Sequence, residues 1–237
     1  MAERMWLRQL AAGRDFATTN PVARNMQNFV YLIGDSQTRE CLVVDPAWDV
    51  AGILKCVADE GYTLKGALVT HWHPDHVGGN MMGDPAEGLA ELLAVSPVPI
   101  HAHPKDHAFI RMMTGVSASD LKAVSGGDKV TVGAIEVECL HTPGHTQGSQ
   151  CFRCGNALVA GDTLFLNGCG RIDLPGGDVE EMWRTLYERL ANLPADLVLY
   201  PGHDYADRPF APLEDVRRTN PMLQAPDYET FLQIRGG

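Results

Sequence analysis

The sequence has 237 residues, of which 45% are hydrophobic and 21% charged, and this length favours one large domain. Its formal net charge of −11 argues against nucleic acid or an anionic membrane as a main partner, because both need a basic surface. The N-terminal segment is charged throughout, unlike a secretory signal, and no apolar run approaches the roughly 18 residues of a membrane span. We therefore expect a cytoplasmic protein that binds neither membranes nor nucleic acid.

Short apolar runs bounded by glycine, proline, aspartate and asparagine recur along the chain and predict β-strands. They lie at 28–35, 40–47, 66–71, 98–103, 129–141, 149–154, 157–162 and 197–203. Helices are expected at 50–60, 179–192 and 227–234. For the second of these, Asp178 suits the N-cap, Glu181 has the spacing of a capping box and Pro194 ends the helix. This mixture predicts an α/β chain whose residues 1–237 form a single domain.

The six cysteines are scattered, and without a secretory signal they are expected to be reduced and mostly buried. Cys151 and Cys154 form a C-x-x-C spacing, but no second such pair accompanies it and it lies in a predicted strand. A metal or redox role is therefore not expected for this pair.

Four of the apolar runs lead into a residue that can bind metal. These residues are His71, His145, Asp162 and His203. Strand ends are rigid, and the loops that leave them carry function in α/β folds. If neighbouring strand ends meet at one edge, these four side chains and His73 converge there.

The stretch THWHPDH, residues 70–76, contains enough metal-binding side chains to contact more than one metal ion. Imidazole and carboxylate suit zinc, iron or manganese. His71 and His73 can reach one metal, whereas Asp75 and His76 follow a proline that bends the chain and can address a second. A carboxylate such as Asp162 has two oxygens and can bridge both ions.

The motifs THWHPDH, HTPGHTQGS, AGDTLF and YPGHDY, in this order, resemble the metallo-β-lactamase superfamily over about residues 28–221. The resemblance implies a four-layer αβ/βα sandwich with the metals at the sheet edge. It implies one metal on His71, His73 and His145, a second on Asp75, His76 and His203, and Asp162 between them. GDTLFLNGCGR is most similar to the glyoxalase II group and the related persulfide dioxygenases. True β-lactamases usually have cysteine where this chain has Asp162, so antibiotic hydrolysis is not expected.

This resemblance implies a hydrolase in which a hydroxide shared by two divalent metal ions attacks a thioester or ester. Zinc is expected first, with iron or manganese as alternatives, and Asp75 would also orient the hydroxide. The alternative is a dioxygenase acting on glutathione persulfide, with one iron held by His71, His145 and Asp162. A catalytically silent metal-binding protein is disfavoured, because every ligand position carries a competent residue.

The substrate is expected to be a small anionic thioester. By resemblance to glyoxalase II, Arg171 and Tyr205 would contact the glutathione portion of such a substrate. Only about thirty residues follow His203, however, so the helical C-terminal domain of typical glyoxalase II enzymes is not matched, and the ending is more like that of the persulfide dioxygenases. A homodimer is compatible with the sequence.

A second histidine-rich stretch, HAHPKDH, carries His101, His103 and His107. No further set of downstream ligands remains to complete a second metal site, so we predict a loop or a wall of the pocket there. Asp204 is expected to hold the loop near His203. The segment 83–99 is expected to contribute to the rim of the pocket.

Overall fold

The computed structural model describes residues 4–81 and 83–236, and two six-stranded sheets form its centre. In spatial order, the first sheet contains β1 (Met5–Ala11), β2 (Phe29–Asp35), β3 (Glu40–Val44), β4 (Thr63–Leu68), β7 (Ile100–Ala102) and β8 (Leu121–Ala123). The second contains β14 (Ala211–Pro212), β13 (Val198–Pro201), β12 (Ala157–Gly161), β11 (Gln150–Cys154), β10 (Ile135–His141) and β9 (Lys129–Val132). A separate hairpin is formed by β5 (Gly79–Met81) and β6 (Asp84–Ala86).

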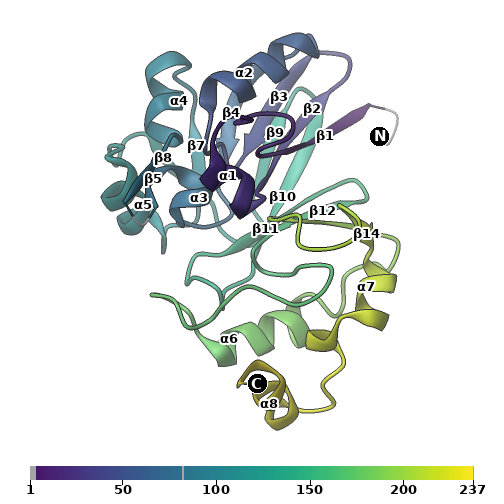
Figure 1. Cartoon of the computed structure of the whole chain (residues 1–237). Helices are drawn as coiled ribbons and strands as arrows, with labels where there is room; N and C mark the ends of the chain where they lie inside the picture. The colour runs from purple at the N-terminus through teal and green to yellow at the C-terminus, as the bar shows by residue number, and fades with distance from the viewer. Residues whose placement is uncertain (1–3, 82, 237) are drawn as a thin grey trace.

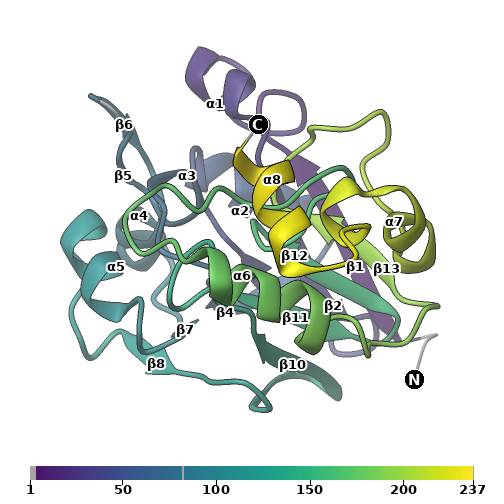
Figure 2. The same cartoon turned by 90° about the horizontal axis from the view of Figure 1, so that it is seen from below.

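Helices cover the outer face of each sheet (Figures 1 and 2). Those of the first half are α1 (Pro21–Met26), α2 (Val50–Asp59), α3 (Pro74–Val77), α4 (Leu89–Val95) and α5 (His107–Thr114). Those of the second half are α6 (Val179–Arg184), a π-helical stretch (Thr185–Arg189), α7 (Leu213–Thr219), a 3₁₀ turn (Pro221–Leu223) and α8 (Tyr228–Gly236). None of the described helices is long and apolar enough to cross a membrane.

Three hydrophobic cores separate four layers of structure. Alternate residues of β2 point to opposite faces: Phe29 and Tyr31 lie in the core between the sheets, whereas Val30 faces the core under the first-half helices. A third core lies between the second sheet and α6, α7 and α8. This arrangement confirms the predicted four-layer αβ/βα sandwich.

The two cysteines of the C-x-x-C spacing belong to different cores. Cys151 faces the helices of the second half, whereas Cys154 points into the core between the sheets. Both thiols are buried, and burial raises the pKa of each to about 11. They therefore serve as small apolar side chains of one strand.

The helix predicted at 179–192 is regular only in its first turns. Asp178 caps it as predicted, because its side chain accepts a hydrogen bond of 3.0 Å from the amide of Glu181. The reciprocal bond of a capping box is not formed, since the amide of Asp178 donates to Gly144. From Thr185 the chain continues as a π-helix, which ends before Leu190. The Thr185 hydroxyl donates to the carbonyl of Pro143, which ties this helix to the loop of the HTPGH motif.

The remaining predicted helices agree with the structure to within a residue or two, since 50–60 corresponds to α2 and 227–234 to α8. Strand β1 was not predicted from the sequence. Its residues Arg8 and Gln9 interrupt the apolar pattern, and only pairing with β2 along its whole length makes it a strand.

Candidate metal centre

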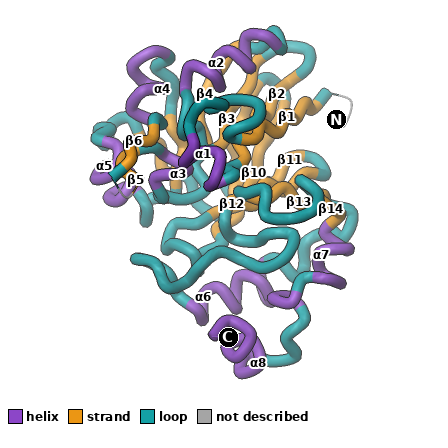
Figure 3. The backbone as a smooth tube through the Cα atoms, in the orientation of Figure 1, coloured by secondary structure: helices purple, strands orange, loops and turns teal. Residues whose placement is uncertain are grey.

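The predicted ligands lie on loops that leave the ends of strands in both sheets. His71 and His73 follow β4, and the short helix α3 carries Asp75 and His76. His145 follows β10, Asp162 directly follows β12, and His203 lies two residues after the end of β13. Figure 3 shows long loops between the strands and α6, and these include the segments after β10 and β12. The two sheets thus contribute ligands to one region, as the pattern of strand ends predicted.

One group consists of three buried histidines, here called the histidine trio: His71, His73 and His145. His73 Nδ1 lies 3.0 Å from His71 Nε2 and 2.9 Å from His145 Nε2. Three ring nitrogens therefore converge on one point, which is the arrangement that a single metal ion requires.

The opposite nitrogens of two of these rings are held by the protein. His71 Nδ1 lies 3.0 Å from the Thr70 hydroxyl oxygen, which itself donates to Asp45 Oδ2 and so accepts from the ring. His145 Nδ1 donates to the backbone carbonyl of Arg171 at 2.6 Å. Both contacts place the proton on Nδ1 and leave the lone pair of Nε2 facing the centre of the trio.

A second group, here called the carboxylate trio, consists of Asp75, His76 and His203. Asp75 Oδ2 lies 3.4 Å from the Nε2 atoms of both histidines, which are 3.3 Å apart. Three ligand atoms about 3.3–3.4 Å apart fit the edges of a tetrahedron around a metal with bonds near 2 Å. The structure thus brings together the three side chains that the family resemblance grouped as a second candidate ligand set.

Three contacts orient the carboxylate trio. His76 Nδ1 lies 2.9 Å from Asp45 Oδ2, and His203 Nδ1 donates to the carbonyl of Met26 at 2.7 Å. The Asn28 amide donates to Asp75 Oδ2 at 3.0 Å. Asp45 and Asn28 were not identified from the sequence. Asp45 shares the signal that identified the others, since it directly follows β3, whereas Asn28 precedes a strand and carries no such signal.

Asp162 joins the two groups. Its Oδ2 lies 3.3 Å from His203 Nε2 and 3.7 Å from His145 Nε2, and its Oδ1 lies 3.4 Å from His76 Nε2. Oδ1 is buried and makes no hydrogen bond within the described chain. A carboxylate in this position can bridge two cations.

The charge balance of the cluster favours cations. Burial opposes ionisation of Asp75 and Asp162, but the adjacent histidines outweigh it and hold the pKa of both carboxyls below the usual range. Burial likewise opposes protonation of His76 and His203, yet the carboxylates raise the pKa of both rings. Protons on these rings therefore balance two buried anions, a role that metal ions can take over.

The histidine trio has the opposite tendency. Burial lowers the pKa of His71 and His145, and it lowers that of His73 to about 3, so that these rings are neutral. Neutral imidazole is the form that binds metal. Converging lone pairs, a buried carboxylate oxygen that makes no hydrogen bond, and nearby anionic charge together make the residues present a fit for two divalent cations.

The two residues predicted to contact substrate lie differently with respect to this centre. The Tyr205 ring stacks on His203 with centroids 4.6 Å apart, and 53% of its surface is exposed, so it lies at the mouth of the site. The Arg171 side chain is 63% exposed and makes two hydrogen bonds to Asp173, at 3.0 and 2.6 Å. Its backbone carbonyl, not its guanidinium, contacts a residue of the histidine trio.

The second histidine-rich stretch does not place its histidines in any of the metal-binding groups found among residues 4–81 and 83–236. The ring of His103 stacks on His141 with centroids 4.0 Å apart, and the ring of His107 contacts the carbonyl of Ala102. Asp204 forms an ion pair of 3.6 Å with Arg14, and its amide donates to Gln27, which anchors the chain after His203.

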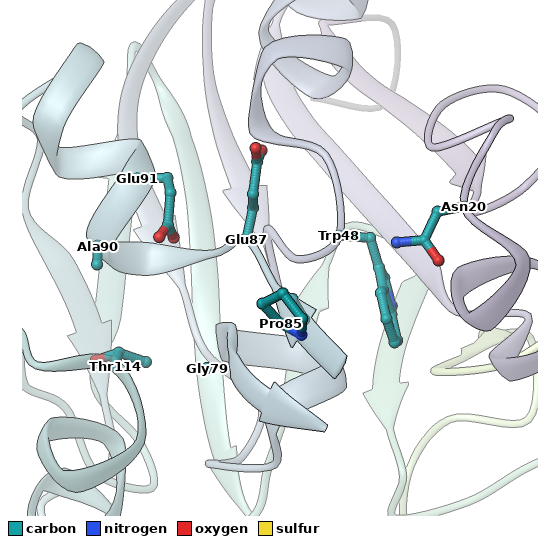
Figure 4. Close-up of a pocket in the computed structure, with 9 residues that line it drawn as sticks. Asn20, Trp48, Gly79, Pro85, Glu87, Ala90, Glu91 and Thr114 are labelled. Atoms are coloured by element: carbon teal, nitrogen blue, oxygen red, sulfur yellow. The ribbon is translucent and has the colours of Figure 1, made fainter. Parts of the chain in front are cut away.

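A cavity of about 470 Å³ is lined in part by residues of the segment 83–99, but no residue of either trio lines it. Trp48 and Asn20 form one side, Ala90 and Glu91 the other, and Pro85 lies between them (Figure 4). Trp48 also donates from its indole nitrogen to the side-chain oxygen of Asn28 at 2.9 Å. One lining residue is thus linked to Asp75 through the side chain of Asn28.

The fold and the two joined ligand groups define a class of four-layer αβ/βα proteins that can hold metal ions at the sheet edge. A family model described as "Metallo-beta-lactamase superfamily" matches residues 23–203. The chain belongs to this superfamily, in the branch that contains glyoxalase II and ETHE1-like proteins. The superfamily is one of enzymes.

Relatives of two activities resemble this chain. It is 39% identical to a hydroxyacylglutathione hydrolase of Polaromonas sp. over 76% of this chain, but the match spans only 64% of that protein. It is 31% identical to the mitochondrial persulfide dioxygenase ETHE1 of Homo sapiens over 88% of this chain and 76% of that protein. The crystal structure of ETHE1 from Myxococcus xanthus aligns with a TM-score of 0.77 at 28% identity, covering 98% of this chain and 90% of that one.

Proposed function

We propose that the chain is a metal-dependent hydrolase of small thioesters or esters. Its centre would use two divalent cations, with zinc first and iron or manganese as alternatives. The observation that carries this proposal is the position of Asp162, whose two oxygens face both ligand groups. The ligands would be His71, His73 and His145 for one ion, Asp75, His76 and His203 for the other, and Asp162 for both.

Two bound cations would acidify a shared water molecule and polarise the carbonyl of the substrate. In hydrolysis the water oxygen bonds to the carbonyl carbon, the carbon–sulfur bond breaks, and the departing sulfur takes up a proton. We assign Asp75 a catalytic role in addition to metal binding. Its carboxylate is held ionised by His76 and His203, so it can accept a hydrogen bond from the water and orient it.

The proposed substrate is an anionic thioester such as an acylated glutathione. Tyr205 lies where such a substrate would enter, stacked on His203. Partial burial, together with Asp162 and Asp75, raises the pKa of Tyr205 to about 12, so its hydroxyl stays protonated and can donate to a substrate anion. Arg171 supplies a positive charge on the neighbouring loop and is the second proposed contact.

The relatives support this proposal in part. The hydroxyacylglutathione hydrolase is 39% identical, which exceeds the identity to the human dioxygenase. The matched region spans 64% of that hydrolase's length, which is less than two thirds, and the hydrolase's activity and substrate are part of the proposal for this chain.

A second candidate is a persulfide dioxygenase with a single iron on His71, His145 and Asp162. Two observations favour it: the human ETHE1 match covers 76% of that protein, and the Myxococcus xanthus ETHE1 structure aligns over 90% of its chain. Two histidines and a carboxylate are also a recurrent iron site that leaves positions open for oxygen and substrate.

The deciding experiment combines metal analysis with two assays on protein purified without added metal. For the hydrolase we expect about two metal ions per chain, cleavage of acylated glutathione, and an unchanged rate when oxygen is removed. Oxygen uptake on glutathione persulfide, with about one iron per chain and no thioester cleavage, would reject the hydrolase proposal and support the dioxygenase.

A further inference from the structure

Asp106 belongs to the second histidine-rich stretch but contacts the loops of the metal centre. It lies immediately before α5, and only 1% of its surface is exposed. Its Oδ2 accepts hydrogen bonds from the amide of Trp72 at 3.2 Å and from the hydroxyl of Thr146 at 2.8 Å. Its Oδ1 accepts from the amide of Gly148 at 2.8 Å. One carboxylate therefore ties together two loops from different sheets.

Both of these loops carry members of the histidine trio. Trp72 lies between His71 and His73 in the sequence, and Thr146 directly follows His145. The three hydrogen bonds of Asp106 thus fix the distance between the loop after β4 and the loop after β10. That distance sets the separation of His145 Nε2 from the ring nitrogens of His71 and His73, because each of the three residues lies next to one that is hydrogen-bonded to Asp106.

The hydrogen bond from Thr146 to Asp106 is part of a continuous network of donors and acceptors. The Ser149 hydroxyl accepts from the amide of Thr146 and lies 2.9 Å from the Thr146 hydroxyl, to which it can donate. The Thr146 hydroxyl is then free to donate to Asp106. Such a network has a defined direction, and a carboxylate is the acceptor at its end.

Glycine at position 148 allows the carboxylate to approach. A Cβ atom added there would lie 2.5 Å from Cγ and Oδ1 of Asp106, a contact that real side chains do not make. Trp72 has a second contact close to Asp106, because the ring of Phe109 in α5 stacks on its indole with centroids 4.8 Å apart. Trp72 of the first histidine-rich stretch is therefore contacted by Asp106 of the second stretch and by Phe109, which lies two residues beyond it.

Keeping a carboxylate at this position has an energetic cost. Its three partners are neutral donors, and burial raises the pKa of Asp106 to about 6 despite them. A buried anion without an opposite charge destabilises the folded state, so its presence calls for a role beyond packing.

We propose that Asp106 is a positioning residue for the histidine trio, which holds the loops of residues 70–73 and 142–148 at the spacing that one metal ion requires. The inference rests on the metal centre of the proposed function but not on its substrate. Its effect is confined to one group, because the carboxylate trio is oriented by Asp45, Asn28 and Met26 instead.

The test measures zinc affinity in two single-site backgrounds by competition with a chelator. His203→Ala removes a ligand of the carboxylate trio and leaves the histidine trio, and His73→Ala does the reverse. We expect Asp106→Asn to weaken zinc binding by about ten- to a hundred-fold in the His203→Ala background, the usual size for a residue that orients metal ligands. In the His73→Ala background we expect a change below about three-fold.

Asparagine keeps the shape of the side chain, but it has only one acceptor oxygen, and its amide NH2 group would face one of the donors that Asp106 now accepts from. Asp128→Asn is the matched control, because Asp128 also accepts a backbone amide, that of Ser125, but lies in an exposed turn. Thr146→Val removes one of the three hydrogen bonds to Asp106 and should weaken zinc binding in the His203→Ala background by about five-fold. This variant replaces Asp106→Asn in the test if Asp106→Asn does not fold.

Equal weakening of zinc binding in both backgrounds would show that Asp106 supports the fold as a whole. Unchanged zinc binding in both would show that the hydrogen bonds of Asp106 are not needed to position the histidine trio. Either result overturns the proposal. The unmodified protein is titrated in parallel: if it binds no zinc, the proposed metal centre fails, whereas normal binding with an unaffected Asp106→Asn variant rejects only the role of Asp106.

Discussion

His145 Nδ1 donates a hydrogen bond of 2.6 Å to the backbone carbonyl oxygen of Arg171, while the guanidinium of Arg171 turns to Asp173. The loop after β12 thus orients one member of the histidine trio through its main chain. Because the second nitrogen of a metal-binding histidine sets the tautomer and the ring orientation, the conformation of this loop is coupled to the metal centre. The main-chain and side-chain roles of Arg171 can therefore be separated by substitution.

Asp162→Asn should abolish most activity and release much of the bound metal. The amide lacks the negative charge that offsets two cations, and its nitrogen cannot act as a ligand. We expect activity to fall by more than about a hundred-fold, which exceeds the usual effect of losing a residue that only orients ligands. Metal content and turnover are measured against Asp196→Asn, a change at an exposed aspartate. Full metal content and normal turnover in Asp162→Asn would refute the assigned bridge.

Replacement of both His101 and His103 by alanine should leave the metal stoichiometry unchanged. Neither residue belongs to the metal-binding groups found in the described part of the chain. The free energy of unfolding should nevertheless fall by about 1–3 kcal/mol, because His103 is buried and stacks on His141. Metal analysis and denaturant unfolding of the double variant check both statements, and loss of metal from a folded variant would show that the second stretch contributes ligands.

The buried carboxyl of Asp106 should make stability depend on pH. Burial raises its pKa to about 6 from 3.8, so the folded state holds the proton more tightly than the unfolded state does. Its contribution is therefore fully favourable below about pH 4 and is lost as the pH rises through about 6.

Asp106→Asn removes this titration. Between about pH 5 and pH 7.5, unmodified protein should lose on the order of 1 kcal/mol more of its unfolding free energy than the variant does. Denaturant unfolding of both proteins without metal measures this difference. The other titrating groups are the same in both proteins, so their contributions cancel when the two unfolding free energies are subtracted. Parallel pH profiles would indicate that Asp106 has an ordinary pKa.

The convergence of the candidate ligands could be predicted because these residues share a local signal. His71, His145, Asp162 and His203 each follow a buried apolar run, and such runs end where strands end. Asp45 carries the same signal but precedes proline and alanine, and the stretch is equally typical of a turn. Its role becomes clear only when Thr70 and His76 are seen to converge on its carboxylate.

Other contacts have no local signal in the sequence. Met26 and Arg171 orient histidines through backbone carbonyl oxygens, which every residue has. Asp106 lies 34 residues from Trp72 and 42 from Gly148, so only the pairing of β4 with β7 and the packing of the two sheets bring its partners together. Long-range hydrogen bonds of this kind depend on topology and not on periodicity.

Arg171 and Asp173 provide the test of the anionic substrate. Arg171→Ala keeps the carbonyl that orients His145, so metal content should be unchanged. The KM for an acylated glutathione should rise by about two- to five-fold, with little change in kcat, because an exposed charged contact contributes at most about 1 kcal/mol. Asp173→Asn should lower that KM by a similar factor, since it removes the carboxylate that now pairs with the guanidinium. A neutral ester of similar size should respond to neither change. If both substrates are affected equally by Arg171→Ala, or if metal is lost, then the side chain shapes the loop and does not contact the substrate.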